Sequence, residues 1–202
     1  MRVAVLASGV GTNLQALLDE VHGAAGVEIV AVASDKPDAK ALARAQAAGV
    51  PSRAFPAAEY GDRAQRDAAM ARWLEQSQPD LVVLAGYMQL LSPEFLGRFQ
   101  YRVINVHPAL LPAFSGLRAV EQALAYGVKV FGVTIHFVDE GVDTGPVILQ
   151  RAIELPDART EEEVLARLQS IEHELLPEAV RLIAAGAVRF DAENPRRVVI
   201  ER

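Results

Sequence analysis

Residues 2–13 read RVAVLASGVGTN. The apolar run at 2–8 is typical of a strand buried on both faces, and the glycines that follow allow a tight turn into a helix. The first N–H groups of a helix lack backbone partners, and together with the helix dipole they attract an anion. The segment therefore predicts a strand, a turn and a helix. Two interpretations of the turn stay open: a phosphate site, or a plain turn capped by Thr12 or Asn13.

A dinucleotide site is disfavoured at the same turn. Leu14 stands where the pattern G-x-G-x-x-G requires a third glycine for close packing of the helix. Asp35, at the end of the next apolar run, could still imitate the acid that binds a ribose in such sites.

Further apolar runs alternate with helical patterns along the whole chain. Candidate strands cover 2–8, 28–34, 80–86, 102–107, 132–138 and 147–155, and candidate helices cover 13–24, 39–48, 62–78, 118–126 and 160–185. This alternation predicts an α/β, Rossmann-like fold, with helices on both faces of a mostly parallel, twisted sheet. Trp73 suits core packing, and the residues after Gly186 favour a terminal hairpin. No linker divides the sequence, so we expect a single domain over residues 1–202.

The expected helix at 160–185 opens on TEEE, which makes a capping box of Thr160 and Glu163. We expect a kink or break near Pro177, since proline removes a helical hydrogen bond. Its apolar side chains form a row that includes Leu165, Leu168 and Leu176. Glu172 falls in that row, which places an acid at the edge of the buried stripe.

Composition narrows the classes of function. The 202 residues carry a net charge of -6, which argues against general electrostatic binding to nucleic acid or to an acidic membrane. The sequence contains no cysteine, which excludes disulfides, thiol nucleophiles and thiolate metal sites. The first residues do not resemble a secretory signal, and no apolar run has the length of a membrane span, so we expect a cytoplasmic location.

The stretch VINVHP at 103–108 carries two polar residues in an apolar strand. Side chains alternate along a strand, so Asn105 and His107 share one face. Ligands of an open α/β sheet bind beyond the carboxyl ends of its strands, which is where this pair emerges. A carboxamide and an imidazolium on one face form a donor set for a developing oxyanion. The alternative is a structural histidine bonded to a backbone carbonyl.

An acidic loop, DEGVDTGP at 139–146, follows another apolar run. Its three acids do not have the spacing of a calcium loop, and we expect no metal. A carboxylate beside an imidazolium would instead raise the pKa of the histidine. His107 would then stay protonated near neutral pH and act as a general acid, with Asp143 able to receive a proton through water. His136 is expected to have a structural or supporting role.

Several motifs together resemble the phosphoribosylglycinamide formyltransferase family. They are SGVGTNLQALL, LVVLAGYMQLLSPEFL, VINVHPALLPAFSGL and GVTIHFVDEGVDTGPVILQ, and they occur in the expected order between Met1 and about Gly186. The pairing of NVHPALLP with HFVDEGVDTGP is highly specific to the wider formyltransferase group. The resemblance implies transfer of a formyl group from 10-formyltetrahydrofolate to the amine of glycinamide ribonucleotide, in purine biosynthesis.

The resemblance also implies roles for individual residues. The catalytic positions of the family fall on Asn105, His107 and Asp143. The substrate-binding positions fall on Gly11, Thr12 and Asn13 at the phosphate, on Glu172 at the ribose, and on Pro108. The folate-binding positions fall on Arg63, Tyr87, Met88, Gln89, Leu90, Leu91, Val138 and Glu140. By its place alone, Arg63 would be a surface charge at a helix start that Asp62 caps. The implied partners are small molecules, neither nucleic acid nor membrane, and the chain is expected to be a monomer or a homodimer.

Two positions depart from the family pattern. Gln89 replaces an arginine where the family commonly reads MRLL, and FSGL with Arg118 replaces the usual PGLH. Three other functions remain in view. A methionyl-tRNA formyltransferase would be expected to have a longer chain with a tRNA-binding domain. A formyltetrahydrofolate hydrolase would be expected to have an extra N-terminal domain. A non-catalytic nucleotide-binding module would explain the glycine turn but would leave Asn105, His107 and Asp143 without a purpose.

Overall fold

The computed structural model describes residues 1–201. The chain divides into two compact units, the first comprising residues Met1–Asn105 and the second beginning at Val106. Each unit is described by itself. Strand β5 (Val103–His107) contributes its first three residues to the first unit and its last two to the second.

The first unit is built on parallel strands in the order β3-β2-β1-β4-β5. The other strands are β1 (Arg2–Leu6), β2 (Glu28–Ser34), β3 (Ser52–Ala54) and β4 (Leu81–Leu84). Every pairing among them is parallel, and β1 and β4 are almost entirely buried. The predicted parallel sheet is confirmed, whereas β3 was not predicted from the sequence.

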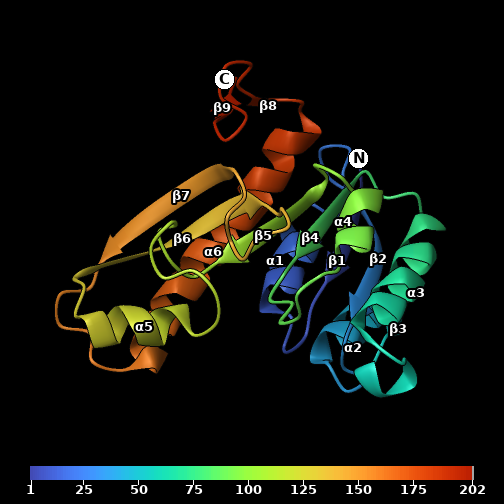
Figure 1. Cartoon of the computed structure of the whole chain (residues 1–202), viewed down its shortest axis with the longest axis horizontal. Helices are drawn as coiled ribbons and strands as arrows, with labels where there is room; N and C mark the ends of the chain where they lie inside the picture. The colour runs from blue at the N-terminus through green and yellow to red at the C-terminus, as the bar shows by residue number, and fades with distance from the viewer. Residues whose placement is uncertain (202) are drawn as a thin grey trace. The chain divides into compact units, whose positions relative to one another are not determined.

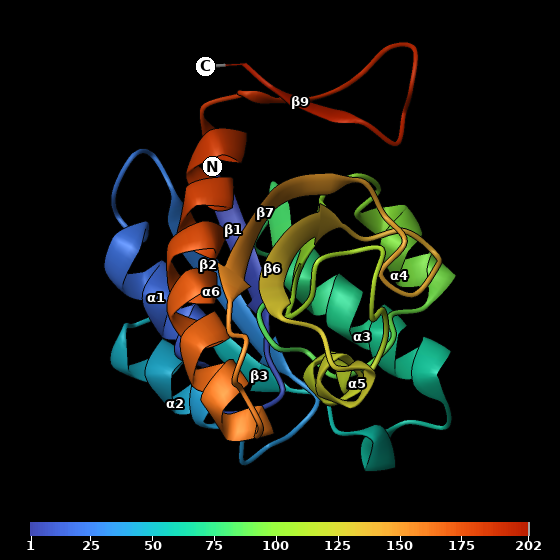
Figure 2. The same cartoon turned by 90° about the vertical axis from the view of Figure 1, so that its left-hand side faces the viewer.

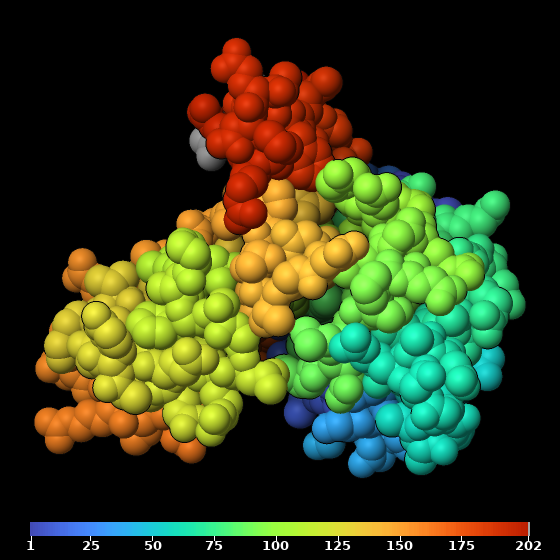
Figure 3. All heavy atoms as spheres, in the orientation of Figure 1, coloured from blue at the N-terminus to red at the C-terminus, as the bar shows by residue number. Residues whose placement is uncertain are grey.

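Helices cover both faces of this sheet. The unit contains α1 (Thr12–Glu20), α2 (Lys40–Ala47), η1 (Ala57–Glu59), α3 (Arg63–Glu75) and α4 (Pro93–Arg98). Figure 2 shows α1 and α2 together on one side of strands β1 and β2, with α3 and α4 on the other. In the space-filling view the atoms of α3 and α4 lie next to each other on the face shown (Figure 3). The predicted layer arrangement is therefore present in the first unit.

The second unit contains an antiparallel pair, β6 (Val130–Phe137) and β7 (Val147–Glu154), joined by the acidic loop (Figure 1). Helix α5 (Ala119–Tyr126) precedes the pair, and α6 (Glu161–Ala184) follows it and packs against both strands. Strands β8 (Val188–Phe190) and β9 (Val198–Ile200) form the predicted terminal hairpin.

Helix α6 has the predicted capping box, since Thr160 and Glu163 each bond the backbone of the other. The helix is continuous through Pro177, so the predicted break is wrong. Leu165 is also misplaced by the sequence pattern, because it is 41% exposed. The buried stripe runs instead through Val164, Leu168, Leu175, Leu176, Ala179 and Val180. Leu165 lies one residue, about 100° around the helix, from that stripe.

Trp73 is half-buried, with its ring 5.8 Å from the ring of buried Phe55, so it packs at the edge of the core and not inside it as predicted. Among the described helices, none combines the length and the apolar character needed to cross a bilayer.

Candidate active site

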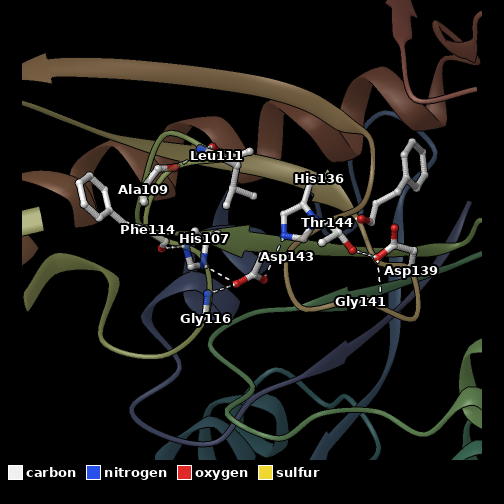
Figure 4. Close-up of polar contacts among 12 residues, drawn as sticks. His107, Ala109, Leu111, Phe114, Gly116, His136, Asp139, Gly141, Asp143 and Thr144 are labelled. Carbon is white, nitrogen blue, oxygen red and sulfur yellow. Dashed lines mark hydrogen bonds and ion pairs between the residues drawn. The ribbon is translucent and has the colours of Figure 1, made fainter. Parts of the chain in front are cut away.

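His107 ends β5, and both nitrogens of its buried ring face oxygen acceptors (Figure 4). Nε2 lies 2.9 Å from the carbonyl oxygen of Phe114, and Nδ1 lies 3.3 Å from Oδ2 of Asp143. A carbonyl oxygen only accepts hydrogen bonds, so Nε2 carries a proton and donates it to Phe114. The second, exchangeable proton position is therefore Nδ1, on the side of Asp143.

Asp143 lies between two imidazoles (Figure 4). Its Oδ2 faces His107 and accepts the N–H of Gly116 at 2.8 Å, while its Oδ1 lies 3.5 Å from Nε2 of His136. The residue has φ +53°, a left-handed conformation that aspartate tolerates better than most residues. The structure thus brings together two predicted catalytic residues, His107 and Asp143, within the second unit.

The electrostatics of this contact differ from the sequence prediction. Burial by itself would raise the pKa of Asp143, but hydrogen bonds from His136 and Gly116, with the charges of both histidines, lower it to about 2. Burial lowers the pKa of His107, against the opposing effects of the Phe114 carbonyl and the Asp143 carboxylate. Asp143 does act to raise the His107 pKa, as predicted, but the net shift is downward, so the prediction that His107 stays protonated near neutral pH is wrong. Desolvation of the ring outweighs the carboxylate, and His107 is neutral near pH 7.

A neutral His107 is poised to take a proton. Its Nδ1 lone pair faces a carboxylate oxygen, and protonation of Nδ1 converts this contact into a charge-assisted hydrogen bond. Asp143 therefore stabilises the imidazolium once it forms, in the manner of the carboxylate of a catalytic triad. The arrangement suits a base that accepts a proton during a reaction better than a permanent cation.

His136 faces Asp143 directly, which its position in the sequence alone does not indicate. Its Nδ1 lies 2.8 Å from the carbonyl oxygen of Phe137, and its Nε2 faces Asp143. The ring is 2% exposed. This geometry agrees with the predicted supporting role, and it fixes the second carboxylate oxygen of Asp143.

Thr134 and Gln150 brace the chain that follows His107. The Thr134 hydroxyl donates to the carbonyl of Ala109 at 2.6 Å and accepts the N–H of Leu111 at 3.1 Å. Nε2 of Gln150 donates to the Leu111 carbonyl at 2.8 Å. Sequence reasoning missed Gln150, which is an exposed residue of β7 and gave no signal in the burial pattern of that strand.

The acidic loop uses Asp139 for its own structure. Asp139 Oδ1 accepts the N–H of Gly141 at 3.1 Å and the hydroxyl of Thr144 at 2.6 Å. Gly145 is required by close approach, because a Cβ there would lie 1.8 Å from the Phe137 carbonyl oxygen. Val138 is half-buried and Glu140 is exposed. Within residues 1–201 no group of three or more His, Asp or Glu side chains is arranged to hold a metal ion.

Asn105 belongs to the first unit, where it pairs with Leu84 of β4 and is half-buried. It precedes His107 by two residues on the same strand, as predicted. Pro108 follows directly and is half-buried. In the second unit, Glu172 is half-buried on α6.

The glycine turn begins α1 without a side-chain cap. Gly11 is the N-cap residue, with φ +74°, so the expected cap by Thr12 or Asn13 is wrong. A Cβ at Gly11 would lie 2.7 Å from Cβ of Ala41, which explains the glycine by close packing of α2 as well as by backbone conformation. The backbone N–H groups and the dipole at the start of a helix attract an anion such as a phosphate.

The stretch 87–91 follows β4 and presents two apolar side chains to solvent. Met88 is 62% exposed and Leu90 is 56% exposed, whereas Tyr87 is buried. Burial raises the pKa of Tyr87 far above its usual value, with Arg66 opposing and two nearby aspartates adding to the shift. Arg63 is exposed, and Asp62 caps α3 by accepting the N–H of Gln65 at 2.8 Å, as predicted.

Sequence reasoning missed the buried charges beside this stretch. Arg66 and Asp67 are consecutive on α3 and form an ion pair at 2.9 Å, with side chains 3% and 0% exposed. Two adjacent charges on a helix gave no signal of burial, because helix surfaces are normally charged.

Comparison with known proteins defines the class. The formyl transferase family model matches residues 1–180, and the chain belongs to this family. It is 41% identical over 183 residues to phosphoribosylglycinamide formyltransferase from Bacillus subtilis, covering 89% of this chain and 93% of that protein. A crystal structure of glycinamide ribonucleotide transformylase 1 from Symbiobacterium toebii has a TM-score of 0.95 and 46% identity, covering 100% of this chain and 94% of the other.

Longer relatives also match. The chain is 43% identical over 196 residues to the trifunctional purine biosynthetic protein adenosine-3 of Bos taurus. The match covers 96% of this chain but only 19% of that protein.

Proposed function

We propose that the chain is a phosphoribosylglycinamide formyltransferase, acting as one formyltransferase domain over residues 1–202. It transfers the formyl group of 10-formyltetrahydrofolate to the amine of glycinamide ribonucleotide, a step of purine biosynthesis. The single observation that carries the chemistry is the contact of His107 with Asp143, at 3.3 Å inside the second unit. Family membership supports the choice of substrates.

The reaction is acyl transfer by direct attack of the amine. The amine nitrogen bonds to the formyl carbon, and the formyl oxygen becomes an oxyanion. The bond from carbon to N10 of the folate then breaks, and its electron pair stays on N10. The attacking nitrogen gives up one proton and N10 gains one, so the protein has to move a proton and stabilise the oxyanion.

His107 and Asp143 move the proton. The proton of the attacking amine passes through a water into the contact between Oδ2 of Asp143 and Nδ1 of neutral His107, and Asp143 stabilises the resulting imidazolium. The imidazolium then returns the proton to N10. The low pKa of Asp143 keeps this carboxylate ionised throughout.

Asn105 supplies the oxyanion donor. A carboxamide N–H does not titrate, so it donates at every pH at which the proton relay operates. Its place two residues before His107 on β5 gives both side chains the same face of the strand.

The substrate-binding roles follow from the resemblance and fit the local structure. The uncapped start of α1, at Gly11, Thr12 and Asn13, holds the phosphate of the ribonucleotide. Glu172 contacts the ribose, and Pro108 is a further substrate-binding residue.

The folate lies on the exposed apolar side chains of the stretch 87–91. The resemblance assigns donor binding to Tyr87, Met88, Gln89, Leu90, Leu91 and Arg63 of the first unit. It assigns the same ligand to Val138 and Glu140 of the second unit. Both ligands are small molecules, and a net charge of -6 does not favour a tRNA acceptor.

The proposal is tested by incubating purified protein with 10-formyltetrahydrofolate and glycinamide ribonucleotide. Folate release is followed by absorbance and formylated acceptor by mass spectrometry. We expect one formylated acceptor for each folate released, and negligible release when water is the only acceptor. Equal release without the amine would identify a hydrolase, and no release with either acceptor would favour a binding module.

A further inference from the structure

The ion pair of Arg66 and Asp67 also holds a neighbouring backbone segment in place. Nε and Nη2 of Arg66 both donate to Oδ1 of Asp67, at 3.0 and 2.9 Å. Oδ2 of Asp67 accepts the backbone N–H of Ser92 at 2.7 Å. Because Asp67 is fully buried, this bond ties the chain just after the stretch 87–91 firmly to α3.

The third nitrogen of the Arg66 guanidinium, Nη1, contacts the stretch 87–91. Nη1 of Arg66 lies 3.4 Å from Oε1 of Gln89, as donor and acceptor. A guanidinium only donates hydrogen bonds, so residue 89 must present an acceptor to make this contact. Gln89 is itself exposed, while Arg66 is buried. The contact therefore connects a solvent-facing position to a charge in the core.

A third tie lies at the start of the stretch. The N–H of Met88 donates to Oγ of Ser8 at 2.8 Å, in the glycine turn after β1. The stretch is thus held at Met88, Gln89 and Ser92, while the side chains of Met88 and Leu90 stay exposed. Ties on backbone and polar groups that leave apolar side chains free are what a preorganised ligand surface needs.

We propose that Arg66 is a positioning residue for the formyl donor, acting through Gln89 to hold the stretch 87–91 in its binding conformation. This inference rests on the proposed function, which places the donor on that stretch. It makes the acceptor at position 89 a determinant of donor affinity. A positively charged side chain at position 89 weakens binding of the formyl donor. It has no hydrogen-bond acceptor for Arg66, and its charge repels the buried guanidinium.

The test uses substitutions at exposed Gln89, which leave the core intact. Gln89→Met has a similar length but no acceptor, and Gln89→Arg adds the opposing charge. We expect the KM for 10-formyltetrahydrofolate to rise severalfold in the first and about tenfold in the second, the loss of a hydrogen bond to a charged group. The KM for glycinamide ribonucleotide, kcat and the melting temperature should change little. An unchanged or lower donor KM in Gln89→Arg would overturn the inference.

Two controls separate positioning from direct contact with the donor. The same pattern is expected with 10-formyltetrahydropteroate, which lacks the glutamate of folate. A rise in KM confined to the glutamate-bearing donor would overturn the inference. Gln89→Glu keeps a hydrogen-bond acceptor for Arg66 and leaves the pair of Arg66 and Asp67 intact, so the KM should stay within about threefold of wild type. A KM at least as high as in Gln89→Arg would contradict the coupling.

Calorimetric titration with tetrahydrofolate keeps this inference separate from the proposed function. A Kd that follows the same order, wild type below Gln89→Met below Gln89→Arg, supports positioning even where glycinamide ribonucleotide is not formylated. Formylation by all three proteins with identical folate Kd values would leave the function standing and overturn the positioning role.

Discussion

In each unit an aspartate contacts a buried basic side chain, and the surroundings of the two carboxylates differ. Asp67 meets only fixed donors, the guanidinium of Arg66 and the N–H of Ser92. Asp143 meets two imidazoles in addition to the fixed N–H of Gly116. A guanidinium never loses its proton under ordinary conditions, whereas an imidazole does so near neutral pH. The first contact therefore suits holding a segment in place, and the second suits moving a proton.

The largest effect is expected when the side chain of His107 is removed from the second contact. In His107→Ala the proton acceptor is lost while the fold is kept, and kcat should fall about 10²- to 10³-fold or more. The measurement is steady-state turnover with both substrates, with urea unfolding on the same sample to show that the variant is folded. Turnover near wild type in a folded sample would contradict the role of the second contact.

Breaking the first contact, between Arg66 and Asp67, should lower the stability of the fold and not the rate of the chemical step. Asp67→Asn leaves the buried guanidinium of Arg66 unpaired, and the free energy of unfolding should fall by about 3 kcal/mol. Urea denaturation measures it, and the exposed Asp38→Asn is the matched control, expected within about 0.5 kcal/mol of wild type. Equal stabilities of the two variants would show that the buried pair holds nothing in place.

Asp143→Asn tests whether the carboxylate of the second contact acts in the chemical step. The amide keeps the shape but cannot stabilise the imidazolium of His107, so kcat should fall about 10²-fold. The KM for 10-formyltetrahydrofolate should change less than kcat, which single-turnover and steady-state kinetics together would show. Near wild-type kcat would mean that the carboxylate does not support the histidine.

The sequence predicts the contact of His107 with Asp143 better than it predicts its electrostatics. His107 ends one apolar strand and Asp143 follows another, and the ends of neighbouring strands lie near each other, so their proximity could be expected. The sign of the His107 pKa depends on how completely the ring is desolvated, which follows from packing of distant residues. Charge spacing along a chain contains no measure of that burial.

The same limit explains the missed elements of the first unit. Strand β3 has three residues and α4 has six, too short for periodicity to register. Helix α4 nevertheless had a local signal, because Ser92 caps it and Pro93 occupies its first turn. Burial of Arg66 and Asp67 had none, since it depends on the chain after β4 folding back onto α3.

The smallest expected effect is a displacement of the His107 titration. Burial lowers its pKa below the ordinary value of 6.5, and Asp143 is one of the groups that oppose the shift. In Asp143→Asn that opposition is lost, so the midpoint should move further down. NMR titration of the histidine ring resonances measures both midpoints, with the His107 signal assigned by its loss in His107→Ala.

The sign of this shift also fixes its effect on folding. Because the folded pKa of His107 lies below the unfolded one, the unfolded chain binds the proton more readily. The contribution of neutral His107 to stability is therefore present above about pH 6.5, the ordinary histidine pKa, and is lost as the pH falls through the folded pKa. Replacing His107 by Gln should flatten this part of the stability profile between neutral and mildly acidic pH. A wild-type midpoint above 6.5 would mean that the carboxylate outweighs burial and that His107 enters the reaction already charged. A midpoint that rises in Asp143→Asn would mean that the carboxylate does not stabilise the imidazolium.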